Sequence, residues 1–121
     1  MAYEQSLTTV SLEAGSDLST KQYYAVKITT LKLAVANGAG GMLGVLQNDP
    51  SASGAPGTVA ISGITKWLAG GAVTAGSYIA VDTNGKCVNA VSGDIAEGIA
   101  MITGVDGDVV SVLLKPIGKI W

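Results

Sequence analysis

Few side chains in this sequence of 121 residues could perform chemistry, and histidine is absent. Without histidine, Ser-His-Asp and Cys-His catalysis are excluded, and so are zinc sites that use histidine. Cys87 is the single cysteine, so it can form neither an intrachain disulfide nor a thiolate metal site. Its simplest interpretation is a small buried hydrophobic residue in a strand. We therefore expect no catalytic residue, no metal and no cofactor.

Two pairs of carboxylates remain as candidates for acid–base chemistry. Asp106 and Asp108 flank Gly107, and Asp94 lies near Glu97. A glycosidase needs two carboxylates across a cleft, whereas these acids lie in turn-forming segments, where aspartate bends and caps the backbone. A weak calcium site at Asp106 and Asp108 is the alternative, but a hard cation takes six or more oxygen ligands. The pattern favours a structural role, and an enzyme is the least expected class.

Two glycine motifs fall short of nucleotide-binding fingerprints. After the cluster Gly38-Ala39-Gly40-Gly41, a dinucleotide fingerprint needs a glycine where the chain has Leu43. A P-loop needs Ser or Thr after Gly-Lys, but Cys87 follows Gly85-Lys86. The glycine cluster is therefore predicted to be a turn.

Aromatic residues are candidates for contact with a partner. Tyr23, Tyr24 and Trp67 predict either ordinary packing or a platform for a carbohydrate or protein. Trp121 predicts either packing on its own domain or anchoring to a neighbouring subunit.

The first twenty residues are polar, with isolated apolar residues among them. Residues 1–20 predict an N-terminal arm or first strand that contacts a partner, followed by a β-barrel domain over residues 21–121. With the aromatic candidates, the predicted partner-contact residues are Tyr3, Leu7, Val10, Tyr23, Trp67 and Trp121.

Composition narrows the range of partners. Apolar residues make up 48% and charged residues only 13%, so we expect a packed core and some surface covered by a partner. The seven basic residues are scattered lysines, with no arginine, which argues against nucleic-acid binding. No apolar run approaches the ~20 residues of a membrane span. MAYEQSLTTV lacks the features of a secretory signal, so we expect synthesis in a cytoplasm.

Short alternating segments between turn signals predict a mostly β fold, a small single-domain β-barrel or sandwich with little helix. Residues 23–36 alternate twice, and the change of parity at Thr29-Thr30 predicts a bulge or bend. Residues 77–91 predict a hairpin around Asn84-Gly85, and Asp106-Gly107 predicts a second hairpin turn. In residues 95–104, Ala96, Gly98, Ala100 and Ile102 lie opposite Ile99 and Met101.

Five features follow one another along residues 58–115. They are a strand with Ser62-Gly63-Ile64, a connector Val73-Thr74-Ala75-Gly76, a hairpin from Tyr78 to Gly85, a strand with Glu97-Gly98-Ile99-Ala100, and an acidic turn with a valine-rich strand from Asp106 to Leu114. In this order, they resemble the C-terminal halves of the capsid cement (decoration) proteins of tailed bacteriophages.

The resemblance implies a small β-barrel that binds the outer surface of the major capsid protein shell in the virion. Such proteins bind commonly as homotrimers and stabilise the shell, and residues 1–20 would then lie along the capsid as an added strand. One alternative is another phage structural module, such as a tail tube, a fibre or the base of a head fibre. A second is a carbohydrate-binding or adhesin domain with Tyr23, Tyr24 and Trp67 as its platform.

Overall fold

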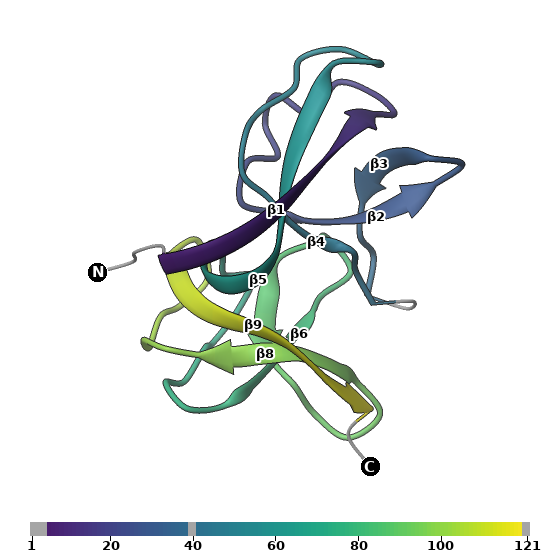
Figure 1. The fold of residues 1–121 in the computed structure, drawn as a ribbon. Coiled ribbons are helices and arrows are strands. Elements are labelled where there is room, and N and C mark those ends of the chain that lie inside the picture. Colours follow the sequence, from purple (N-terminus) through teal and green to yellow (C-terminus); the bar gives the residue numbers. More distant parts are fainter. Residues whose placement is uncertain (1–4, 39–40, 120–121) are drawn as a thin grey trace.

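The computed structural model describes residues 5–38 and 41–119, and every helix or strand that it contains is a β-strand (Figure 1). The mostly β prediction is therefore confirmed. The strands are β1 Gln5–Ala14, β2 Ala25–Thr29, β3 Lys32–Val35, β4 Gly44–Leu46, β5 Pro56–Leu68, β6 Tyr78–Val81, β7 Cys87–Asn89, β8 Ile95–Ala100 and β9 Val109–Lys119.

All nine strands belong to one sheet, in the order β1-β3-β2-β4-β5-β9-β8-β6-β7. An additional pairing of β1 with β5 closes the first five strands into a ring. β1 runs antiparallel to β5 from Glu13↔Pro56 to Gln5↔Ile64, but it meets β3 only at Glu13 and Ala14. Of the two predictions for the N-terminal region, the first strand is therefore what the structure shows for residues 5–14. The division into residues 1–20 and 21–121 stays a prediction.

The long strand β5 joins the ring to the rest of the sheet. Its first part pairs with β1 and β4, and residues 63–68 pair with β9. β9 then pairs with β8, β8 with β6, and β6 with β7. Figure 1 shows β5 running from the upper part of the molecule toward β9 and β8.

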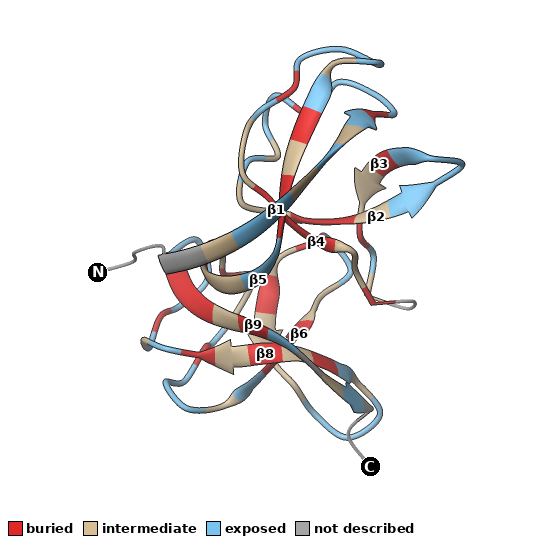
Figure 2. Ribbon diagram, in the orientation of Figure 1, coloured by how far each residue is buried: buried red, intermediate tan, exposed pale blue. Residues whose placement is uncertain are grey.

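Two clusters of buried side chains form the core, and buried residues recur along β5, β8 and β9 (Figure 2). The ring holds one cluster, made of Ala14, Leu18, Val26, Leu33, Leu46 and Val59. The other is centred on Trp67, whose side chain is fully buried. At ~25 cal/mol per Å², burying the roughly 150–250 Å² of an aromatic side chain contributes about 4–6 kcal/mol.

The β6–β7 hairpin confirms the prediction for residues 77–91, with Ile79 opposite Asn89. The connection, residues 82–86, is longer than a two-residue turn. Within it, the Asp82 carboxylate accepts the N–H groups of Asn84 (2.8 Å) and Lys86 (2.9 Å). Gly85 carries the positive φ, 81°. Its carbonyl accepts both the Ala25 N–H (2.7 Å) and the Trp67 indole N–H (3.1 Å), so this loop ties Trp67 to β2.

A tight turn, rather than a bulge, explains the change of parity at residues 29–30. Thr30 and Leu31 both have positive φ, 50° and 64°, and Thr29 pairs with Lys32 across the turn. This geometry is a two-residue hairpin of the primed type, which favours Asn-Gly. Since Thr30-Leu31 carries no turn signal, the sequence pattern predicted a bulge or bend at Thr29-Thr30 instead of a hairpin turn.

Candidate partner-binding surface

The acidic residues near the two predicted turns act within the backbone. The Asp94 carboxylate accepts the Val91 N–H (2.9 Å), and the Asp108 carboxylate accepts the Val105 N–H in the same way (3.0 Å). These contacts support the structural role predicted for the aspartates. Within residues 5–38 and 41–119, no group of three or more His, Cys, Asp or Glu side chains could hold a metal ion.

Cys87 is buried, as predicted, and its sulfur lies 3.9 Å from the Trp67 carbonyl oxygen. Burial raises the pKa of the thiol to about 12. A thiol with this pKa is protonated at neutral pH, and the thiolate is the nucleophilic form. Cys87 is therefore a packing residue.

Glu97 lies within β8, not in a turn. Partial burial raises the pKa of its carboxyl group, and a hydrogen bond from the Met42 backbone opposes that rise. A Cβ on Gly41 would lie 2.7 Å from the same carboxylate. Glu97 thus fixes the β3–β4 connection against β8.

The predicted aromatic contacts divide between the core and the surface. Trp67 has 0% exposure. Of the two roles that the sequence left open for it, the structure supports ordinary packing. Tyr23 is half-buried, with its ring 5.9 Å from the Lys66 ammonium. Its backbone, at φ 67°, donates to the Leu46 carbonyl and accepts from the Leu68 N–H. The structure therefore separates Trp67 from the surface on which Tyr23 lies.

The remaining predicted contacts lie on β1 or outside the described residues. Leu7 and Val10 are half-buried and pack against the two core clusters, Leu7 against that of Trp67 and Val10 against that of the ring. Tyr3 and Trp121 lie outside the described residues.

A cross-strand row of large apolar side chains is the feature that the sequence reasoning missed. Tyr78 pairs with Ile99, Ile99 with Leu113, and Leu113 with Ile64, so these four residues point to one side of the sheet. We call them the apolar row. The neighbouring residues Ile79 and Leu114 point the other way and are buried in the core. The apolar row therefore faces away from the core; Tyr78 is 49% exposed, and Ile64, Ile99 and Leu113 are half-buried.

Further exposed apolar residues extend this face, and the signal for it was present in the sequence. By strand alternation, Ile95, Met101 and Val109 lie on the same side as the apolar row, and all three are exposed. Across four strands about 4.8 Å apart, the row spans roughly 14 Å. On β8 the small residues Ala96 and Ala100 are buried while the large ones face outward. Small residues inside and large residues outside were the available signal.

The tip of the β2–β3 hairpin is a second exposed apolar feature. Leu31 is 82% exposed, more than any other large hydrophobic residue in the described parts of the chain, and Ile28 is exposed beside it. Figure 1 shows this hairpin projecting from the side of the ring. We call Thr30 and Leu31 the hairpin tip.

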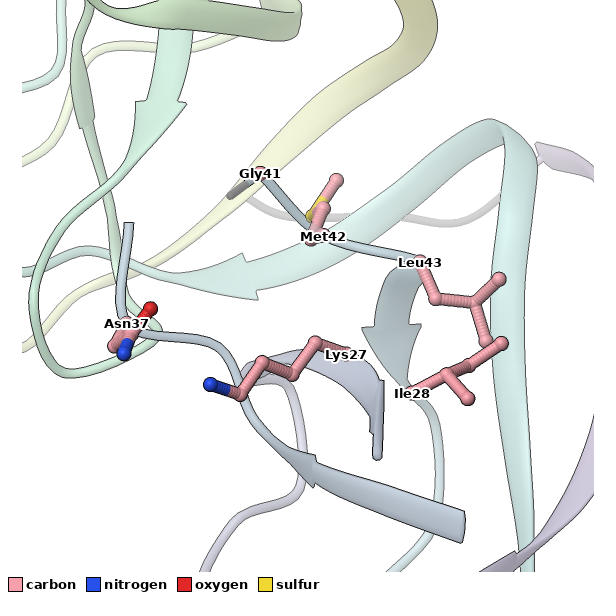
Figure 3. A pocket seen from close by; sticks show the side chains of 6 residues that line it. All are labelled: Lys27, Ile28, Asn37, Gly41, Met42 and Leu43. Atoms are coloured by element: carbon pink, nitrogen blue, oxygen red, sulfur yellow. The ribbon is translucent and has the colours of Figure 1, made fainter. Parts of the chain in front are cut away.

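Surface pockets offer little for catalysis. A pocket of about 400 Å³ beside the hairpin is lined by Lys27, Ile28, Asn37, Gly41, Met42 and Leu43, with Lys27 as its only titratable side chain (Figure 3). A larger pocket, of about 680 Å³, lies between the β6–β7 hairpin and the start of β8. Its lining includes Val81, Val88 and Ile95, together with Asp82 and Asp94. We call it the acidic pocket.

The model of the phage cement protein family matches residues 5–116, which is nearly the whole chain. The chain belongs to the phage cement protein family. The resemblance that residues 58–115 carry is therefore confirmed, and the match extends it over β1 to β4 as well.

The fold of this cement protein also occurs in another phage head component. The crystal structure of the N base of head fibre gp8.5 from bacteriophage phi29 is similar, with a TM-score of 0.73 and 15% sequence identity. The match covers 95% of this chain and 98% of that one. No curated protein matches the chain.

Membership in the family makes this a virion-associated structural protein that associates with a capsid shell. We therefore look for surfaces that could bind another protein, and the apolar row and the hairpin tip are the candidates. No helix in the described parts of the chain is long and apolar enough to cross a membrane.

Proposed function

We propose that this cement protein is a small β-barrel, synthesised in the host cytoplasm, that binds the outer surface of the capsid as a homotrimer and stabilises the shell. It performs no reaction and needs no nucleic acid or membrane. The observation that carries the proposal is the family match over residues 5–116. The ring of five strands supports the barrel, and the structural roles of Cys87, Asp94 and Asp108 support a protein without catalysis.

The apolar row is the surface that we assign to the shell. Its four members are uncharged and lie side by side on four strands, so covering them would remove apolar surface from water. Exposed contiguous apolar surface on a small protein marks a site of interaction. Each contact can be modest, because many copies on one lattice act together.

β1 supports a second contact with the shell, the added strand predicted for residues 1–20. One side of β1 pairs with β5, but the other side pairs only at Glu13 and Ala14. The side chains of Thr8, Thr9 and Ser11 are exposed. A strand with a free edge can accept another chain through backbone hydrogen bonds.

Binding to shells that lack the protein tests the proposal. Purified protein is mixed with such capsids and sedimented, and capsid disruption by heat is then followed. We expect co-sedimentation and a higher disruption temperature. Leu113→Lys places a charge in the apolar row and should abolish both effects, whereas Val105→Lys, at an exposed turn outside the row, should not. Failure of the wild-type protein to bind would overturn the proposal.

A second candidate is the base of a head fibre, which the fold similarity over 95% of the chain favours. A fibre base would bind both the shell and a fibre protein. Electron microscopy of virions distinguishes the two, because a fibre base carries a projecting fibre whereas a cement protein ends at its own surface.

A further inference from the structure

We propose that the hairpin tip of one copy docks in the acidic pocket of a second copy, so that the copies join head to tail. The inference deepens the proposed function, because it rests on the homotrimer and names the surfaces through which its copies meet.

The hairpin tip carries residue types that its own turn does not favour. Thr30 and Leu31 both adopt positive φ, which a side chain with a Cβ disfavours by roughly 1–2 kcal/mol per residue. Leu31 also leaves 82% of its surface in water. The primed turn accounts for the positive φ angles. It does not call for an exposed leucine where glycine would be favoured.

Charge indicates which surface the hairpin tip fits. The hairpin from Ala25 to Ala36 carries Lys27 and Lys32 and no acid, although the whole chain has a net charge of −2. Contact between two identical tips would bring lysines together. The tip therefore fits an apolar depression bordered by carboxylates.

The acidic pocket has this chemistry. Val81, Val88 and Ile95 supply apolar lining, and Asp82 and Asp94 supply two carboxylates without a lysine in the lining. Each carboxylate accepts N–H groups of its own turn, which holds it in place while its charge remains. Leu31 would enter the apolar part, and Lys32 would face a carboxylate.

The tip and the pocket lie at opposite ends of the β2–β3 hairpin. The tip precedes β3, whereas Asn37 and Gly38, just after β3, line the pocket. Four extended residues span about 13 Å, so the hairpin tip and the pocket of one copy are separate surfaces. Both can be occupied at once, by two different neighbours. A head-to-tail contact of this kind closes a ring if the rotation between copies allows it.

Four variants test the contact by size-exclusion chromatography with light scattering. Thr30→Asn/Leu31→Gly removes the leucine and places Asn-Gly in a turn that favours it, so this variant should fold. It should weaken self-association by about tenfold or more. Asp94→Lys should do the same. Asp108→Lys changes an aspartate with the same turn contact outside the pocket, and Val105→Ser removes an exposed apolar residue elsewhere; both should leave association unchanged.

Mixing the two disruptive variants identifies the head-to-tail geometry. Thr30→Asn/Leu31→Gly retains a working pocket and Asp94→Lys retains a working tip, so together they should form a 1:1 dimer that grows no further. Charge exchange within one chain, Lys32→Glu with Asp94→Lys, should restore association that each change weakens alone. A wild-type chain that stays monomeric at the highest concentration reached, or variants that associate as the wild type does, would overturn the inference.

Shell binding separates this inference from the proposed function. If the wild-type chain associates through the tip but binds no shell, the function fails and the contact stands. If Thr30→Asn/Leu31→Gly loses shell binding but still associates, the tip contacts the shell and the inference is overturned.

Discussion

The apolar row and the hairpin tip both place large apolar side chains outside the core, but they are built in opposite ways. The row lies on four paired strands and none of its four residues has a positive φ, so the sheet places its side chains without strain at those residues. The tip has two residues at positive φ and lysines nearby. A broad and mainly apolar face suits contact with a large surface, whereas a narrow projection flanked by lysines suits one defined orientation. The contrast is the reason to assign the row to the shell and the tip to a second copy.

Gly98→Ala should disrupt the pairing of β8 with β9, on which the apolar row depends, and should leave the hairpin tip unchanged. A Cβ at Gly98 would collide with the Leu113 carbonyl oxygen and lie 3.0 Å from Val112, so β8 and β9 would have to separate. We expect unfolding in urea to show a loss of about 2–3 kcal/mol. Gly71→Ala, whose Cβ would lie 3.4 Å from Val88, is the matched control and should be much milder. Equal effects of the two changes would contradict this account of β8.

Salt should affect the two contacts in opposite directions. Raising the ionic strength from about 0.1 M to 1 M shortens the screening length from roughly 10 Å to 3 Å, so association through Lys32 and Asp94 should weaken by about tenfold. Shell binding through the apolar row should hold or strengthen, most clearly in sulfate. Sedimentation equilibrium and capsid binding measure the two separately. Parallel loss of both with salt would show that they share one surface.

Thr30→Asn/Leu31→Gly should stabilise the isolated chain, although it removes the proposed contact. Relief of two unfavourable φ angles should add about 1 kcal/mol to the free energy of unfolding. The comparison is made in an Asp94→Lys background, so that association does not contribute. A less stable double variant would mean that Leu31 supports the fold, and the strain argument would then fail.

Among these predictions, we expect the substitution Glu97→Gln to have the smallest effect on stability. Because burial raises the pKa of its carboxyl group, the native state holds this proton more tightly than the unfolded state does. Its contribution to stability is therefore fully present below the unfolded pKa and is lost as pH rises through the native pKa. Glu97→Gln retains an acceptor for the Met42 backbone, and it should raise the melting temperature at neutral pH but not below pH ~4. A difference that persists in acid would point to packing instead of charge.

Residue types alone predicted the restricted chemistry, one hairpin and the family resemblance. The absence of histidine and the single cysteine restricted the chemistry before any fold was known. The hairpin at residues 77–91 was predictable because its turn residues are local: Asp82 accepts backbone N–H groups within the connection and Gly85 supplies the positive φ. The order of turns and small residues in 58–115 was enough to resemble the family that the chain belongs to.

The tertiary structure decided which face of each strand is covered. Alternation shows that Ile99 and Met101 share a side of β8, but it does not say that the smaller Ala96 and Ala100 are the ones that turn inward. That choice depends on how closely β8 approaches β9 at Gly98 and on the volume that Trp67 fills. The turn at Thr30-Leu31 was hidden for a related reason. Pairing of β2 with β3 holds it in a conformation that its own two residues disfavour, so the turn depends on contacts made by the strands on either side of it.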